Sequence, residues 1–584
     1  MDQQKRTLLA IGLMLGLTLV YTTFLAPPPP PPGAGLDGGV EQADAGTVPA
    51  VVANPVVAPV DADGGTAPAI AEAKLERVTK EVARPEVKVE LDSDGAGLHS
   101  AVLLGKRERQ QVQVGLLEGI QRLFGKKGDD APQMNMAVPV PGGPIPFSIS
   151  MSGAAPLSHA LRYEVVEASA DAVKFKGRAG PWEVEKVFTF GKPYEFKLDV
   201  SLKNTGAAPL SGDFTVHNGR AIDPKKEEAP SFFGSIGNQA SLVCMTGEDI
   251  HRKLPADDEK AKEEFSGAVH FAAIDQQYFL SAVYPTGGAK DGKCKTVASH
   301  TARQVDVVQV LSVAPNETLK LSYGGFIGPK DLELLQKAGA GEAVNPKLDR
   351  SVDFSWWAAI CQVLLAVMKF FHNLTGNWGV AIILLTVSAK LVLLPLTHKA
   401  MLSAENMKKL QPKMEELRKK YADDKEKQNL ETMKLYQTEK VNPLGGCLPL
   451  LLQLPIWAAL FTTLRTSYDL YGAPFYGPVW TDLTLKDPTY ILPLALGVTM
   501  FITQKLQPQM MDPAQAKMFL YFMPIFFTVI MLQYPAGLSL YIFTNNLLSI
   551  AQQFALRRYM KARGLAAPDP PKKPEEPKKP GSKK

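Results

Sequence analysis

Lys390 is the one amine in an apolar run that extends from Ala381 to Leu396. Thr386 lies four residues before it and Thr397 seven residues after it, so the three polar side chains share one face of a helix. A lysine near the centre of a transmembrane helix costs about 2.5–3.5 kcal/mol on insertion scales. The pattern therefore predicts that some feature of the surroundings offsets the charge.

A second polar face lies near the C-terminal end of the chain. Tyr541, Asn545, Ser549 and Gln552 share one side of a helix, and Gln453 lies inside another apolar run. Polar side chains at membrane depth normally face the protein interior or a water-filled cavity.

Hydrogen bonding between helices explains hydroxyl and amide groups at such positions. It does not explain Lys390, because the five apolar runs after the first contain no Asp or Glu to pair with it. An amine without an acidic partner favours water around it, so we expect a cavity. Lys390 lies six residues before Leu396, or about 9 Å along a helix from the end of this apolar run. The charge distribution described below places that end at the cytoplasm, so we expect the cavity to open on the cytoplasmic side.

Motifs for catalysis or metal binding are missing from the sequence. The eight histidines are scattered, and no H-E-x-x-H, phosphate-loop, G-x-S-x-G or C-x-x-C pattern occurs. We therefore predict no catalytic residues, no metal and no cofactor. The net charge of +5 over 584 residues also gives no reason to expect sequence-specific binding of nucleic acid.

Six apolar runs are long enough to be membrane spans, which need about 20 residues each. They cover residues 8–25, 380–396, 444–464, 490–506, 518–534 and 538–554. Lys and Arg number eleven in the segment 397–442 and ten after Phe554. The positive-inside rule then places both termini and this segment in the cytoplasm, and residues 26–378 outside it.

The predicted fold class is a polytopic α-helical membrane protein with an additional exported β domain. The segments are 1–25 (an uncleaved anchor helix, since no A-x-A-like cleavage site precedes Ala26), 26–73 (a Pro/Ala/Gly-rich linker), 74–345 (a β-sandwich), 353–377 (an amphipathic helix), 378–397 (the second span), 398–443 (a cytoplasmic helical hairpin), 444–558 (spans three to six) and 559–584 (a basic tail). Whether 353–377 lies in the membrane interface or spans the membrane is open.

Strict alternation of apolar and polar residues predicts strands in the exported domain. The segments 182–190 and 194–202 form one predicted hairpin, and 305–313 with 318–326 form a second. Cys244 and Cys294 both lie in this domain, where a disulfide is permitted, but the sequence leaves open whether they pair.

The membrane half resembles the YidC-type membrane protein insertases. The similarity lies in "NWGVAIILLT" (377–386), "EKVNPLGGCLPLLLQLPIWAALF" (439–461), "YILPLALGVTMFITQK" (490–505) and "MPIFFTVIMLQYPAGLSLYIFTNNLLSIAQQ" (523–553), with weaker matches at "DQQYF" (275–279) and "YGGFIGPK" (323–330). The resemblance implies a six-span protein of the bacterial inner membrane with a five-helix insertase core. It also implies that the exported domain is a periplasmic β-supersandwich similar to sugar mutarotases, as in the Gram-negative members.

The resemblance further implies insertion of nascent membrane proteins without ATP, alone or with the Sec translocon. The implied substrate groove is lined by one essential cation, Lys390, together with Thr386, Gln453, Tyr541 and Asn545. The ribosome is the implied partner of the cytoplasmic hairpin and the basic tail, and the lipid bilayer receives the clients. Gram-negative members usually have Arg in place of Lys390; lysine keeps the charge but loses the planar fork.

Two other functions remain to be weighed. An ion- or proton-coupled transporter using Lys390 is the first, although no repeat between the spans is evident. A glycan-active exported enzyme with a membrane anchor is the second, but it leaves five further spans unexplained.

Overall fold

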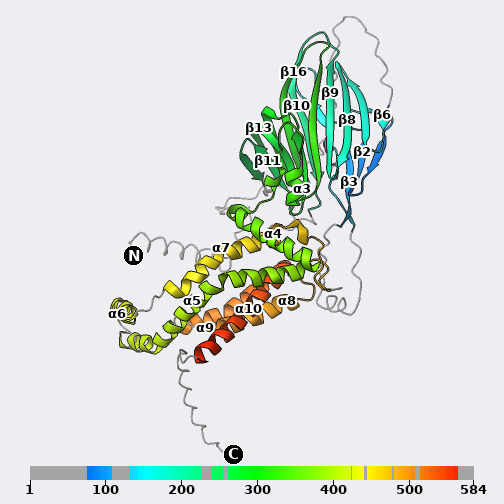
Figure 1. Cartoon of the computed structure of the whole chain (residues 1–584). Coiled ribbons are helices and arrows are strands. Elements are labelled where there is room, and N and C mark those ends of the chain that lie inside the picture. The colour runs from blue at the N-terminus through cyan, green and yellow to red at the C-terminus, as the bar shows by residue number, and fades with distance from the viewer. Residues whose placement is uncertain are drawn as a thin grey trace, which may run out of the picture. The chain divides into compact units, whose positions relative to one another are not determined.

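The computed structural model describes residues 75–107, 132–224, 239–253, 261–421, 424–439, 444–476, 479–506 and 513–562. Strands form the first part of this chain and helices the second (Figure 1). The predicted anchor helix, the linker and most of the basic tail lie outside the described residues.

The strands are antiparallel throughout; β8 and β9 alternate between buried and partly exposed positions, whereas β11 and β14 are buried along their whole length. Their bounds are β1 Thr79–Ala83, β2 Val87–Asp92, β3 Gly97–Arg107, β4 Gln133–Asn135, β5 Ile149–Met151, β6 Glu164–Ala168, β7 Ala172–Ala179, β8 Trp182–Lys192, β9 Glu195–Asn204, β10 Leu210–Ala221, β11 Ser241–Thr246, β12 Asp249–Lys253, β13 Ala261–Asp275, β14 Phe279–Pro285, β15 Ala289–Ser299, β16 Ala302–Val313 and β17 Thr318–Pro329. They form a four-stranded sheet, β1-β2-β3-β4, and a 13-stranded sheet in which the order is β5-β10-β16-β15-β13-β14-β17-β9-β8-β7-β6 and β11 and β12 join beside β13. A β-rich domain is thus confirmed.

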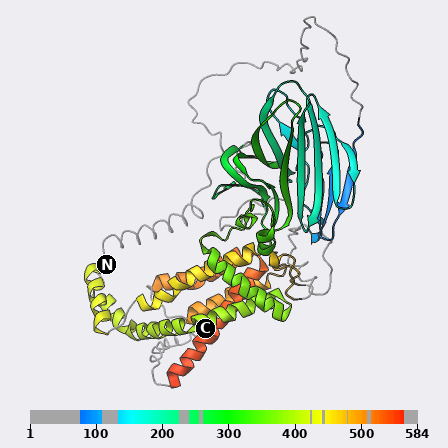
Figure 2. The ribbon, with the colours of Figure 1, turned by 45° about the horizontal axis from the view of Figure 1, so that its top comes forward.

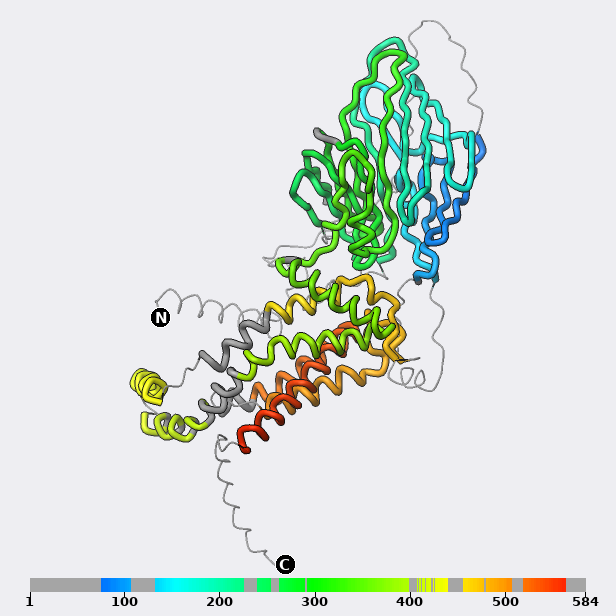
Figure 3. The backbone as a smooth tube through the Cα atoms, in the orientation of Figure 1, coloured from blue at the N-terminus to red at the C-terminus, as the bar shows by residue number. Residues whose placement is uncertain are grey.

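The first predicted hairpin is present, and the second is wrong. β8 and β9 pair with Val184 opposite Leu202, and the backbone trace follows their antiparallel course (Figure 3). β16 instead lies between β10 and β15, whereas β17 lies between β14 and β9. Alternation along a strand specifies which face is buried, but it carries no information about which strand occupies each edge.

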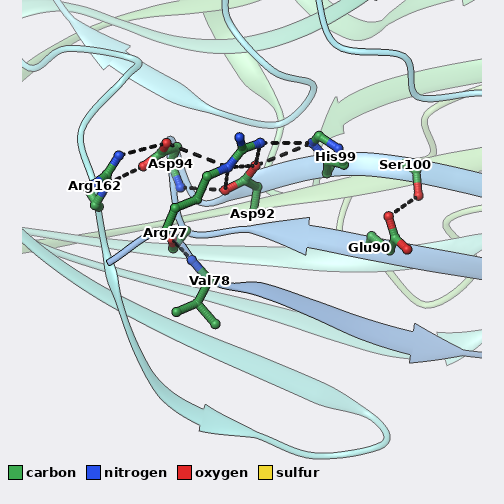
Figure 4. A network of polar contacts seen from close by, with 9 residues as sticks. Arg77, Val78, Glu90, Asp92, Asp94, His99, Ser100 and Arg162 are labelled. Atoms are coloured by element: carbon green, nitrogen blue, oxygen red, sulfur yellow. Dashed lines mark hydrogen bonds and ion pairs between the residues drawn. The ribbon is translucent and has the colours of Figure 1, made fainter. Parts of the chain in front are cut away.

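A network of charged side chains joins the two sheets (Figure 4). Arg77 binds the buried carboxylate of Asp92 at the end of β2, and His99 lies 3.4 Å from the same carboxylate. Arg162, two residues before β6, donates its Nη2 to Asp94 at 3.1 Å. The network ties the edge of the small sheet to the edge of the large one.

Two buried groups in the β domain distinguish it from a purely apolar sandwich. Cys244 of β11 and Cys294 of β15 form a disulfide with a Cα–Cα distance of 6.0 Å, which answers the question that the sequence left open. Lys186 of β8 is fully buried, and its Nζ donates to the backbone oxygens of Gly95 at 3.1 Å and Phe147 at 2.9 Å. The amine therefore has backbone acceptors in place of water.

The helical part follows. Its helices are α3 Leu332–Lys337, α4 Ala358–Thr375, α5 Trp378–Lys420, α6 Lys425–Thr438, α7 Leu444–Thr466, α8 Ile491–Leu506, α9 Pro513–Met531 and α10 Ala536–Ala562. Within the described chain, α4 and residues 378–398 of α5 are long and apolar enough to cross a membrane, and α8 and residues 518–531 of α9 are shorter apolar helices. The helices α5 and α7 to α10 overlap the last five predicted runs, although α5 continues 24 residues beyond residue 396 and α9 is shifted toward the N-terminus relative to 518–534; the six-span topology itself stays a prediction.

The packing of α5, α8 and α10 positions the candidate site. α10 packs against both α5 and α8, and α4 packs against α5 and α7. The ribbons of α5, α8 and α10 run alongside one another, and α4 crosses α7 at an angle (Figures 1 and 2). The side chain of Asn377 caps α5 by accepting a hydrogen bond from the backbone N–H of Val380 at 3.0 Å. From that cap α5 continues as one helix through Pro395 to Lys420.

The "DQQYF" segment of the β domain contacts the end of α7. Gln277 donates its Nε2 to the backbone oxygen of Arg465 at 3.0 Å, and the ring of Phe279 packs edge-on to Tyr468 with centroids 5.8 Å apart. This motif is therefore part of an intramolecular contact rather than of a separate site.

Candidate functional site

Lys390 lies where α5 meets α10. Its Nζ donates a hydrogen bond of 2.8 Å to Oγ of Ser549 on α10. The hydroxyl of Ser549 in turn donates to the backbone oxygen of Asn545 at 2.8 Å. The serine thus accepts from the amine with one lone pair and uses its own proton within its helix.

A second hydrogen bond joins the same two helices. Nε2 of Gln552 donates to Oγ1 of Thr397 at 2.8 Å, and this threonine donates to the backbone oxygen of Leu393 at 3.0 Å. The polar faces predicted on α5 and α10 therefore meet each other. Both links join a side chain of α5 to a residue of the α10 face that contains Ser549.

The other residues predicted to line the groove differ in whether they take part in the polar contact between α5 and α10. Thr386 is 2% exposed and donates to the backbone oxygen of Ile382 at 2.7 Å, so its hydroxyl is used within α5. Tyr541 is 4% exposed and belongs to the apolar core between the helices. Asn545 is half-buried, and its backbone oxygen receives the Ser549 hydroxyl. The side chain of Gln453 lies outside the described ones.

Ser549, the hydrogen-bond partner of Lys390, is not among the residues predicted to line the groove. Its spacing from Asn545 placed it on the polar face, but the sequence cannot give the relative depth of two helices that are 159 residues apart. The direct partner of Lys390 follows only from how α5 and α10 cross.

This arrangement suits binding by charge rather than covalent chemistry. Lys390 is a cation, and the side-chain partner that the structure gives it is a neutral hydroxyl. A carboxylate in place of the hydroxyl brings the opposite charge and turns this hydrogen bond into a stronger ion pair. In the described part of the chain no group of three His, Cys, Asp or Glu side chains has the geometry of a metal site.

The β domain contains a serine–histidine–aspartate arrangement that no motif in the sequence predicts. Oγ of Ser150 lies 2.8 Å from Nε2 of His217, whose Nδ1 lies 3.0 Å from Oδ1 of Asp306. His217 and Asp306 are directly opposite each other in the β10–β16 ladder, and Ser150 is in β5 on the other side of β10. Regular cross-strand pairing therefore explains the geometry. The backbone N–H groups of such a ladder bond to neighbouring strands and are not aimed at an oxyanion.

Comparison with known proteins adds two family matches. Residues 370–563 match a family model described as the 60Kd inner membrane protein, and residues 130–367 match one described as the YidC periplasmic domain. The two matches cover the helical part and most of the β domain.

Individual relatives extend over both parts. A membrane protein insertase YidC from Anaeromyxobacter dehalogenans (strain 2CP-C) is 41% identical over 474 residues, which cover 81% of this chain and 84% of that protein. One of the same name from Geobacter sulfurreducens is 39% identical over 384 residues, 64% of this chain and 68% of that protein. A solved structure of an active YidC insertase is 20% identical, with a TM-score of 0.36, and the match covers 81% of this chain and 91% of that one.

Proposed function

Because this chain belongs to the YidC family of membrane protein insertases, we propose that it passes hydrophobic segments of nascent membrane proteins into the inner membrane through a hydrated groove beside Lys390. The family is a non-enzymatic one, so the chain is an insertase and not an enzyme. Its β-rich part is the periplasmic domain, and we propose the β-supersandwich form for it.

The observation that supports the proposed groove is the environment of Lys390. The amine lies in an apolar helix and bonds to the neutral hydroxyl of Ser549, while the later predicted spans contain no carboxylate. A client with an acidic segment supplies the missing countercharge, and an opposite charge nearby stabilises both ions. When the carboxylate replaces Ser549 as the partner of Lys390, the client's tail gains a charge-assisted hydrogen bond at a depth where water is scarce.

The proposed lining of the groove follows from the polar faces of α5 and α10. We assign Lys390 and Ser549 as the polar contact between α5 and α10, and we include Asn545, Tyr541, Thr386 and Gln453 in the lining of the groove. Thr386 and Tyr541 are buried, so their role is to shape the groove wall rather than to bind the client first.

The proposed topology has six spans with both termini in the cytoplasm. The hairpin of residues 398–443 then faces the cytoplasm, and a hydrogen bond of 3.4 Å from the Tyr436 hydroxyl to Sδ of Met414 supports the pairing of its two helices. We propose that this hairpin and the basic tail, 559–584, dock the ribosome, and that the protein acts alone or with the Sec translocon.

Complementation of a strain depleted of its own insertase tests the charge. Short single-span clients with acidic external tails are scored by protease protection of the tail. We expect Lys390→Arg to support insertion and Lys390→Glu and Lys390→Met to lose most of it. Lys505→Met, which removes an exposed lysine from the last turn of α8 instead, is the matched control and retains insertion. Normal insertion by Lys390→Glu contradicts the electrostatic role.

Coupled transport at Lys390 is the alternative function. Ion or proton flux into proteoliposomes distinguishes it, because a transporter loses flux in Lys390→Met, whereas an insertase shows no flux that depends on this residue.

A further inference from the structure

A second polar stripe follows α10 on a face different from the one that meets Lys390. Ser539, Asn546 and Gln553 succeed one another at intervals of seven residues, which is two helical turns. They are among the most buried side chains of the helix, with exposures of 0%, 9% and 7%. Buried polar groups in a helix that crosses a membrane require an explanation.

Helix geometry and the contact of Arg557 indicate that the stripe faces α8. At 100° per residue, Asn546 is rotated by about 60° from Ser549, on the side away from Asn545. Arg557, one turn after Gln553, reaches across with its Nη2 to the backbone oxygen of Leu506 at the end of α8. The packing of α10 against α8 is the most extensive one among the helices. We call the contact between these two helices the α8–α10 seam.

Side-chain atoms of the stripe lack hydrogen-bond partners among the described residues. They are Oγ of Ser539, Nδ2 of Asn546 and Oε1 of Gln553.

The buried threonines of α8 do not satisfy these atoms. Thr499 donates its hydroxyl to the backbone oxygen of Ala495 at 2.9 Å, and Thr503 donates to that of Thr499 at 2.8 Å. Leaving one buried polar group without a partner costs about 1–3 kcal/mol in a protein interior, and lipid offers no partner either. A dry seam with three such atoms is therefore strongly disfavoured.

We propose that the α8–α10 seam is a water-binding site, in which bound water molecules hydrogen-bond to the stripe of Ser539, Asn546 and Gln553. This inference rests on the proposed placement of α10 across the membrane. Asn546 is ten residues from the start of α10, or about 15 Å, which is the middle of a hydrocarbon layer of about 30 Å. A buried water makes about three hydrogen bonds, and the amides together with free backbone lone pairs supply them.

The consequence is that α10 is hydrated on two faces. One face carries Ser549 and meets Lys390, and the other carries Asn546 and meets α8. Water in the seam satisfies the stripe without a direct bond from Ser539, Asn546 or Gln553 to α8. Separation of α8 from α10 then breaks the Arg557–Leu506 bond at the end of the seam but no direct bond of the stripe.

Thiol reactivity tests the proposal, because a methanethiosulfonate reagent reacts with the thiolate and a thiolate forms only in contact with water. The full chain in membranes carries Cys361→Ala and Cys447→Ala and keeps its disulfide. Asn546→Cys is compared with Leu547→Cys, one residue along at the same depth, where the native leucine is 45% exposed on the outer surface of the helices. We expect labelling of Asn546→Cys to be at least tenfold faster than that of Leu547→Cys.

A second substitution shows that the water lies in the seam. Gln553→Leu removes the amide nearest to the end of the seam, so it slows labelling of Asn546→Cys several-fold, whereas Gln553→Asn leaves the rate within twofold. Equal rates for Asn546→Cys and Leu547→Cys, or no effect of Gln553→Leu, overturn the proposal. The labelling does not depend on client insertion: normal insertion with a dry seam refutes this inference alone, and fast labelling of both variants also refutes the placement of α10 in lipid.

Discussion

Removal of the Cys244–Cys294 disulfide has an effect whose size follows from the structure. The two cysteines are separated by 50 residues and are both completely buried. In the chain-entropy model, a cross-link that closes a loop of this length lowers the entropy of the unfolded chain by about 14 cal/mol/K, or about 4 kcal/mol at 25 °C. For a domain of this size, each kcal/mol lost from the free energy of unfolding lowers the melting temperature by about 2–4 °C.

We therefore expect Cys244→Ala with Cys294→Ala to lower the melting temperature of the β domain by on the order of 10 °C. The assay is thermal unfolding of the full chain in detergent, and addition of a reductant to the native chain gives the same shift if the disulfide is accessible after unfolding. Cys361→Ala, which removes the buried free thiol of α4 and keeps the disulfide, is the matched control: it melts like the native chain and reductant shifts it by the same amount, whereas the double variant is insensitive to reductant. A shift below 2 °C in the double variant refutes the reasoning.

The same pair reports the compartment of the domain. In cells, a variant with Cys361→Ala and Cys447→Ala retains only Cys244 and Cys294 as cysteines. Because the disulfide leaves no free thiol, the variant resists alkylation with a maleimide polymer until it is reduced. Free thiols at both positions in freshly lysed cells contradict a location outside the cytoplasm, since the cytosol keeps thiols reduced.

Three further outcomes are expected. Ser549→Ala removes the hydroxyl that bonds Lys390 and lowers the free energy of unfolding by about 1 kcal/mol while clients are still inserted, because the charge remains; loss of insertion equal to that of Lys390→Met contradicts this. Burial holds the pKa of Lys186 in the folded chain well below its usual value. Between that pKa and the unfolded value of about 10.4, the unfolded chain binds one more proton than the folded chain, so the free energy of unfolding rises with pH over this range. Lys186→Met abolishes that slope in thermal unfolding and costs about 1–3 kcal/mol for backbone oxygens left without a donor; an unchanged slope assigns it to another group. Gly212→Ala places a methyl group against the backbone oxygen of Ser152 and lowers the melting temperature, whereas Gly191→Ala, which meets open space, does not.

The sequence anticipated the polar faces better than their contacts. Residue spacing alone placed Lys390 and Thr397 on one face of α5 and Ser549 and Gln552 on one face of α10, and the structure joins these faces. The period of a helix encodes its faces. The depth at which two helices cross depends on packing between residues far apart in the chain, so Ser549 was not recognised as the partner.

Strand pairing shows the same limit. The strands that became β16 and β17 were recognisable from alternation, but their edges are taken by β10, β15, β14 and β9. The Ser150–His217–Asp306 arrangement could not be predicted either, because it arises from the register between β5, β10 and β16. The buried amine of Lys186 also went unrecognised, since a lysine in an alternating strand reads as an exposed position.

The length of α5 gives the protein a mechanical property. The helix has 43 residues, or about 65 Å of rise, and about 33 Å of it extends beyond residue 398. A tilt of about 10° at that point moves the distal end by roughly 6 Å, and Lys390 lies in the same helix. Pro395 and Pro412 both lie between Lys390 and the distal end, and the missing backbone N–H loosens the helix at each of them. A displacement of the distal end therefore reaches Lys390 through two points of bending and with a smaller amplitude.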